Sequence, residues 1–103
     1  MIKFVEVKQI RDFNVMERRA SVRFELDEVW INPDSILQIR PDLSMKRNLD
    51  SGHLPSDMDA RQEFSKINFG SGSSMSSVTV VGPPEIIAEK IFSSSEKKSI
   101  LHG

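Results

Sequence analysis

The sequence predicts an α+β domain: a small, strongly bent, mainly antiparallel sheet of about five or six strands, closed by a C-terminal helix. Two observations carry this prediction. Short β-branched or alternating segments occupy most of residues 1–81, and one helical stripe of apolar side chains follows them. Strands that come in a run, with a helix after them, are typical of α+β folds rather than of wound parallel sheets. Barrel-like closure of the same strands is the alternative to an open sheet.

The composition indicates one small domain. The chain has 103 residues, 38% of them hydrophobic and 28% charged. This length supports a single core, so we expect one domain over residues 1–93, with a long loop at 41–62 and a C-terminal tail at 94–103. The 14 Lys and Arg residues are matched by 15 Asp and Glu residues, which excludes a globally basic surface. The absence of cysteine excludes disulfides and thiolate metal sites.

The apolar segments also bear on location. The longest apolar runs are far too short to span a bilayer, and residues 1–6 lack the apolar core of a signal peptide. We therefore expect a soluble cytoplasmic protein without membrane insertion. We also expect no cofactor.

The N-terminal third predicts two strands. Residues 1–7 are β-branched and apolar enough for a first strand, and a turn is expected at residues 12–14. Residues 21–27 alternate strictly, as in a half-buried antiparallel strand with one wet face. The apolar positions are even-numbered up to Leu26 and odd-numbered from Val29. A tight turn or bulge at Asp27 and Glu28 is expected to absorb this slip.

The middle of the chain predicts two short strands and a loop. Residues 29–31 and 36–39 are the strands, separated by the turn-forming Asn32-Pro33-Asp34. Residues 41–60 combine proline, glycine, serine and aspartate with few large apolar groups. They predict a long exposed loop, and residues 44–60 within it are expected to be mobile and dispensable for folding.

The C-terminal part predicts a hairpin and a helix. Residues 64–69 and 77–81 are two strands joined by the glycine- and serine-rich residues 70–74. Pro83 and Pro84 suit the first turn of a helix, which Ser93, Ser94 and Ser95 are expected to end. Four apolar side chains at helical spacing predict the face that covers the sheet: Ile87, Ala88, Ile91 and Phe92.

Four segments, taken in order, carry a resemblance to a known family. They are Met1-Ile2-Lys3-Phe4, Val29-Trp30-Ile31-Asn32-Pro33-Asp34-Ser35-Ile36, Ile39-Arg40-Pro41, and Val78-Thr79-Val80-Val81-Gly82 leading to Glu85-Ile86-Ile87-Ala88-Glu89-Lys90-Ile91. Together they resemble the small bacterial FlbD/SwrD-like flagellar proteins and short bacterial and phage proteins of the same build. This chain adds residues 9–28 and 41–62. The resemblance implies the fold and a non-catalytic accessory role exerted by contact, and it implies no catalytic residue.

The chemistry-bearing residues favour no enzyme. His53 lies among Ser51, Ser56, Asp57 and Asp59, but this glycine- and proline-punctuated segment offers no rigid scaffold for a triad or a metal site. Gly70-Ser71-Gly72-Ser73 resembles a phosphate-binding loop only superficially, because no lysine follows it and it enters a strand. We therefore expect no catalytic and no metal-binding residues.

The candidate interaction surface consists of Trp30, Arg18, Arg19 and Arg23. Trp30 has parity opposite to its neighbours, so it either packs under the long loop or the helix, as a lone large aromatic usually does, or is exposed as a contact surface. We expect a protein-interaction or accessory module of bacterial or phage type, with an unknown protein partner. The alternative is a small nucleic-acid-binding regulator that uses the Arg18/Arg19/Arg23 face.

Self-association is also expected. A small sheet leaves unpaired edge strands. Residues 78–81 carry no charge that would discourage edge pairing, so we expect burial, neighbouring strands or a partner to protect them. We therefore expect a homodimer through sheet edges or through the surface around Trp30.

Overall fold

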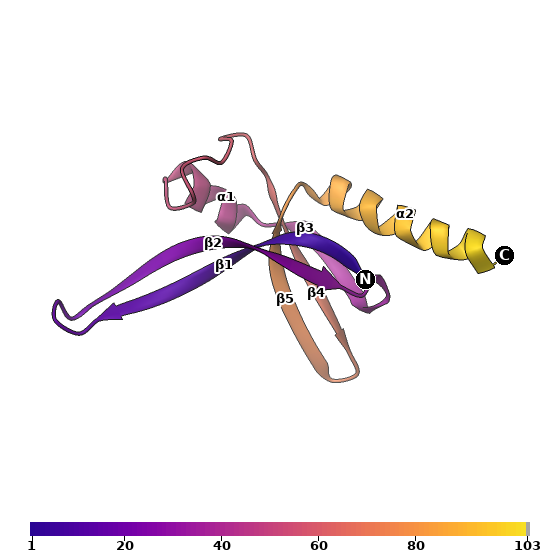
Figure 1. Ribbon diagram of the computed structural model, residues 1–103, viewed down its shortest axis with the longest axis horizontal. Coiled ribbons are helices and arrows are strands. Elements are labelled where there is room, and N and C mark those ends of the chain that lie inside the picture. Colours follow the sequence, from indigo (N-terminus) through magenta and orange to yellow (C-terminus); the bar gives the residue numbers. More distant parts are fainter. Residues whose placement is uncertain (103) are drawn as a thin grey trace.

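The computed structural model describes the backbone of residues 1–102 and the side chains of residues 1–93. Over this range the chain forms an antiparallel sheet, two α-helices and one short 3-10 helix (Figure 1). In chain order they are β1 (Ile2–Asn14), β2 (Arg19–Ile31), η1 (Pro33–Ser35), β3 (Ile36–Pro41), α1 (Leu43–Asp50), β4 (Phe64–Ser71), β5 (Ser74–Val81) and α2 (Pro84–His102). The expected α+β class is confirmed.

The five strands lie in the order β2-β1-β5-β4-β3, and every pairing is antiparallel. β2 and β3 are therefore the two edges, and the sheet is not closed into a barrel. β5, whose uncharged residues 78–81 are expected to need protection, lies in the centre between β1 and β4. Its Val80 is fully buried. Neighbouring strands and burial therefore protect this strand, which is one of the expected alternatives, and self-association through the outer strands or around Trp30 stays a prediction.

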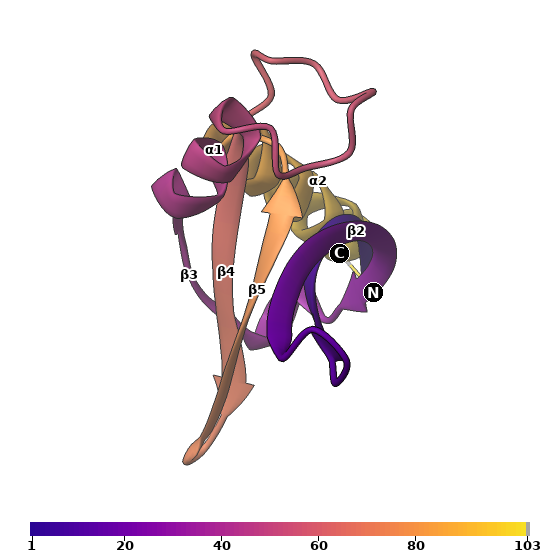
Figure 2. The same ribbon diagram turned by 90° about the vertical axis from the view of Figure 1, so that its left-hand side faces the viewer.

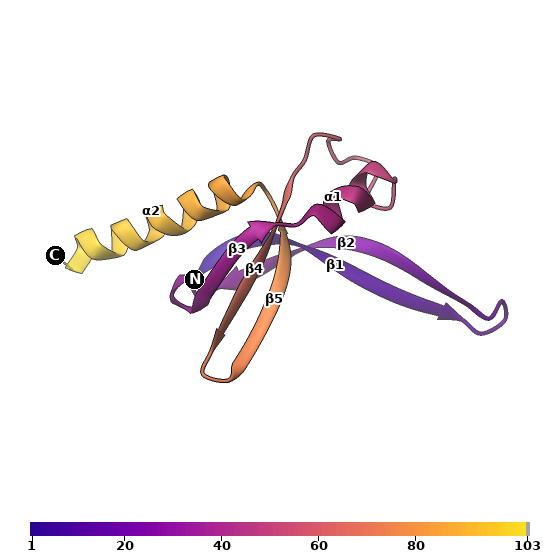
Figure 3. The same cartoon turned by 180° about the vertical axis from the view of Figure 1, so that it is seen from behind.

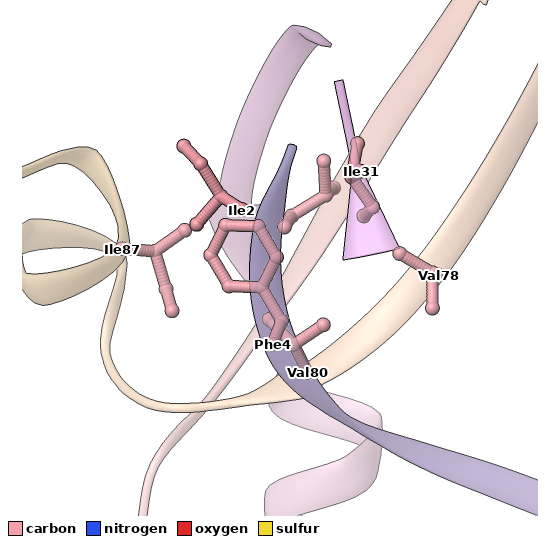
Figure 4. Packing of buried hydrophobic residues seen from close by; sticks show 7 residues of the cluster. Ile2, Phe4, Ile31, Val78, Val80 and Ile87 are labelled. Carbon is pink, nitrogen blue, oxygen red and sulfur yellow. The ribbon is translucent and has the colours of Figure 1, made fainter. Parts of the chain in front are cut away.

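The sheet buries side chains on both faces, and this explains the parity slip. On one face a first cluster joins Ile2, Phe4 and Ile31 to β4, β5 and Ile87 of α2 (Figure 4). On the other face a second cluster contains Val7, with Phe24 packed against it. β1 and β2 pair without interruption from Ile2 opposite Ile31 to Asn14 opposite Arg19. The turn or bulge expected at residues 27–28 is therefore absent from this ladder, because successive apolar stretches of one regular strand serve opposite faces.

The second cluster contradicts the expected long loop. α1 begins at Leu43, where the Asp42 side chain accepts a hydrogen bond from the Met45 amide at 3.0 Å. Such a cap stabilises the first turn of a helix. Met45 and Leu54 are buried together with Phe64. Residues 43–63 are therefore not an unpacked loop: they form α1 and an irregular segment, 51–63, that packs on the second face.

Polar contacts attach this covering segment to the sheet. Thr79 on β5 donates from its hydroxyl to the other Asp42 carboxylate oxygen at 2.6 Å. The Lys46 ammonium donates to the carbonyl oxygens of Ala60 and Gln62 at 2.8 and 2.9 Å. One aspartate thus caps α1 and connects it to the central strand, while one lysine connects α1 to the chain that leads into β4.

The C-terminal hairpin and helix begin as expected. β4 and β5 are joined by the two-residue turn Gly72-Ser73, where Gly72 has a positive φ of 61°. That conformation suits glycine at the first position of a tight hairpin turn. α2 starts at Pro84. Just before this helix, the carbonyl oxygen of Gly82 accepts a hydrogen bond from the Ser65 hydroxyl of β4 at 2.7 Å.

α2 differs from expectation in its length and in its buried face. Its backbone stays helical to His102, so Ser93, Ser94 and Ser95 do not end it and residues 94–102 are not a separate irregular tail. Gly103 lies outside the described residues. Ile87 is buried and Ile91 packs partly on the first cluster, whereas Ala88 and Phe92 are exposed. Only one side of the stripe is buried, the side that bears Ile87 and Ile91, and the adjacent side that bears Ala88 and Phe92 faces solvent. α2 also extends past the sheet (Figures 1 and 3).

The molecule is elongated because the β1–β2 hairpin extends away from the rest of the sheet. Its extents are 61 × 33 × 19 Å and its radius of gyration is 16.2 Å, against ~13 Å for a compact domain of this length. β1 pairs with β5 only at Glu6 opposite Val80, so beyond Val7 its sole partner is β2. We call residues 8–25 the arm; it diverges from the β4–β5 hairpin in Figure 1 and comes toward the viewer in Figure 2.

The arm exists because the first turn comes later than expected. The strand continues through residues 12–14, and the turn occupies residues 15–18. The Asn14 side-chain oxygen accepts hydrogen bonds from the amides of Met16 and Glu17 at 3.0 and 3.3 Å. Asn14 itself still belongs to β1, and its side chain stabilises the turn formed by the residues that follow it.

Candidate protein-interaction surface

The arm has one apolar face. Its cross-strand pairs include Gln9 with Phe24, Arg11 with Val22, and Phe13 with Ala20. These pairs lie on the same side of the ribbon as Val7, because their positions alternate with it by two residues. We call Phe13, Val22 and Phe24 the arm's apolar face; Leu26, just outside the arm, lies on the same side of the ribbon. The apolar face continues the second core cluster outward, but Phe13 is 64% exposed and Val22 48%.

The tip of the arm is apolar as well. Met16 is 93% exposed and Val15 is exposed beside it. Arg18 completes the turn with a positive φ of 52°, a left-handed conformation that is uncommon outside glycine, asparagine and aspartate. An apolar face and an apolar tip therefore extend into solvent from a single hairpin.

The opposite face of the arm is charged and self-neutralised. Arg23 donates from Nε to Asp12 at 2.9 Å and forms a second ion pair with Glu25. These contacts raise the pKa of the Arg23 guanidinium above its ordinary value, and the hydrogen bond that it donates to Asp12 is the largest cause. Lys8 pairs with Asp27 at 3.4 Å on the same face. Because the charges of this face are paired with one another, the face is hydrophilic but carries no basic field.

Trp30 lies away from the three arginines. Its side chain is 57% exposed, so it does not pack under the loop or the helix. Its position has the parity of Val22 and Phe24, opposite to that of Arg23, and seven residues of extended strand put it ~24 Å from Arg23. Lys3 lies opposite it, with its ammonium 6.0 Å from the ring centroid. Within one chain, the four predicted residues do not form one surface.

His53 lies in a hollow between the arm and α1. The lining residues are Gln9, Val22, Phe24, Asn48 and His53. Asp59, which is not among the lining residues, is held by Arg61, whose side-chain and backbone hydrogen bonds lower the pKa of that carboxyl. Among the described residues, no three histidine, aspartate or glutamate side chains gather closely enough to hold a metal ion. The sequence analysis missed this hollow, because only the fold brings residue 9 next to residue 53.

No family model, no curated protein and no solved structure matches the chain significantly. None of the helices in the described part of the chain has the length and apolar character needed to cross a membrane. The arm is therefore the feature of the molecule that points to a function.

Proposed function

We propose that this chain is a non-enzymatic protein-interaction module, an accessory protein of bacterial or phage type, and that the arm carries its partner-binding surface. The observation that supports this is the exposed apolar face of the arm, which extends away from the rest of the sheet. An isolated two-stranded ribbon is marginally stable in water. Exposed contiguous apolar side chains on a soluble protein commonly mark a binding site.

The charge distribution favours a protein partner over nucleic acid. Arg23 is already bound to two carboxylates, and Asp27 lies further along the same face. A phosphate backbone would have to displace these contacts and would meet the acidic side chains. An apolar protein surface needs no such displacement, because the opposite face of the arm stays in solvent.

The test removes apolar groups from the arm without touching the core. The double variant Phe13→Ser and Met16→Ser alters two exposed positions, and Met75→Ser is the matched control because Met75 is 67% exposed on the β4–β5 hairpin. A partner recovered with the wild-type chain is purified, and its affinity for each variant is measured. We expect the arm variant to bind at least about tenfold more weakly, since apolar hot-spot residues each contribute more than about 1 kcal/mol. The control is expected to bind like the wild type.

Two outcomes contradict the proposal. Equal affinity of the wild type and the arm variant would move the binding surface elsewhere. Binding to DNA or RNA that weakens steeply with salt, and that Arg18→Ala with Arg19→Ala abolishes, would support the nucleic-acid alternative instead.

A further inference from the structure

The two edges of the sheet are protected very differently. β3 is short, contains Pro41, and has a register irregularity between Ile36 and Gln38. These features discourage pairing with another chain. β2 is 13 residues long, contains no proline or lysine, and pairs regularly along its whole length. Its outer side pairs with no strand among the described residues. β2 is therefore the edge open to a further strand.

We propose that β2 pairs antiparallel with β2 of a second copy of this chain, across a two-fold axis, with Phe24 opposite Phe24 of the partner subunit. This proposal concerns the edge of the arm and goes beyond its role as a partner-binding face. A two-fold axis perpendicular to the sheet keeps the same face of both copies on one side. The paired strands must then be centred on one residue, which lies opposite its own copy.

The charges of β2 select this register. A centre on any charged residue sets that charge against its own copy, and like charges directly opposite are destabilising. A centre on Leu26 sets Glu25 against Asp27 of the partner subunit, and a centre on Ser21 sets Arg19 against Arg23 of the partner subunit. Only Phe24 and Val22 then remain as centres that pair a substantial part of the strand.

Phe24 is the better of these two centres. It pairs residues 19–29, whereas Val22 pairs only residues 19–25. With Phe24 at the centre, Arg23 faces Glu25 of the partner subunit twice by symmetry, and Val22 faces Leu26 of the partner subunit twice. Both apolar side chains are partly exposed in the single chain, so their pairing removes apolar surface from water.

The same register brings Arg18 and Trp30, which lie far apart within one chain, close together across the interface. Continuing the alignment past the start of β2 places Arg18 opposite Trp30 of the partner subunit. The turn that ends at Arg18 thus comes beside Trp30 of the partner subunit, and a guanidinium near an indole face is a favourable arrangement. Trp30 is the only tryptophan of the chain. Its emission should therefore shift to shorter wavelength as the protein concentration rises.

The decisive experiment exchanges the two charges. Arg23→Glu and Glu25→Arg each create like charges across the proposed interface, so each variant alone should sediment at 11.7 kDa, while the wild type sediments at twice that mass. An equimolar mixture of the two variants restores opposite charges at every pair and should sediment as a dimer. The chain that carries both exchanges should also dimerise.

Matched controls separate pairing from folding. Arg40→Glu makes the same charge reversal at an exposed position on β3, the other edge, and should leave the dimer intact. Recovery of the dimer in the mixture itself shows that both single variants are folded. A monomeric wild type at high concentration would overturn the proposal, as would a dimer that neither single variant weakens.

A cysteine pair checks the register directly, since the natural chain has no cysteine. Phe24→Cys would place two Cα atoms ~4.5–5.5 Å apart across the axis, within disulfide reach. Val22→Cys would place them more than ~14 Å apart, because position 22 then faces position 26. Rapid oxidation of Phe24→Cys alone to a covalent dimer supports the proposal. Rapid oxidation of Val22→Cys, or of neither variant, overturns this register.

Discussion

Replacing Leu54 with alanine tests whether the segment after α1 belongs to the core. Leu54 is 7% exposed and packs with Val7, Met45 and Phe64. Burial of this kind makes a leucine-to-alanine change cost ~2–5 kcal/mol. The cluster lies under an irregular segment that can partly collapse into the space left, so we expect the lower half, ~2–3 kcal/mol. That is a large share of the ~5–15 kcal/mol that stabilises a typical domain.

The assay is urea unfolding followed by circular dichroism, with every variant at one protein concentration because dimerisation would add to the apparent stability. With a urea dependence of ~1–2 kcal/mol per molar, the midpoint should fall by ~1–3 M. Leu43→Ala is the matched control, since Leu43 is 65% exposed at the start of α1; it should change the stability by less than ~0.5 kcal/mol. Equal midpoints for the two variants would refute the packing of residues 51–63 on the sheet.

Three further outcomes can be measured on the same protein. Ile87→Asp should unfold the domain, since it puts an unpaired carboxylate into the first cluster, whereas Phe92→Asp at an exposed position of α2 should melt like the wild type. Asp42→Ala should cost ~1–3 kcal/mol in urea unfolding, because the Met45 amide loses its cap and the Thr79 hydroxyl loses its acceptor; an unchanged midpoint would show that water replaces both contacts. Arg61 lowers the pKa of Asp59, so their contact stabilises the fold above the ordinary aspartate pKa and is lost as the pH falls through the lowered value. In a carbon-detected NMR titration, Arg61→Ala should return the Asp59 midpoint upward, and an unmoved midpoint would assign the shift to another cause.

The local elements were largely readable from the chain. Strict alternation over residues 21–27, a glycine-containing turn between two β-rich runs, and prolines ahead of an apolar stripe each predict an element that the structure confirms. Asp42 ahead of Leu43 and Met45 is also a helix-start pattern for α1. The many turn-forming residues around it favoured a loop when the segment was judged by its composition.

The candidate surface was only partly readable. The sequence singled out Trp30 and the three arginines, and the structure places them along β2 or at the turn before it. It did not single out Phe13, Val15 or Met16, because a turn was expected where the strand continues. The length of the arm depends on where one asparagine side chain bonds, a detail that residue type alone does not decide.

By itself, the sequence determined the period of each strand, the helical face that begins at Ile87 and the charge balance of the molecule, because these properties depend on near neighbours in the chain. Only the tertiary structure decided that a parity slip means two covered faces rather than a bulge. It also decided that β5 is central and β2 an edge. Strand order is set by pairings between distant residues, such as Glu6 with Val80, and no local pattern carries that information.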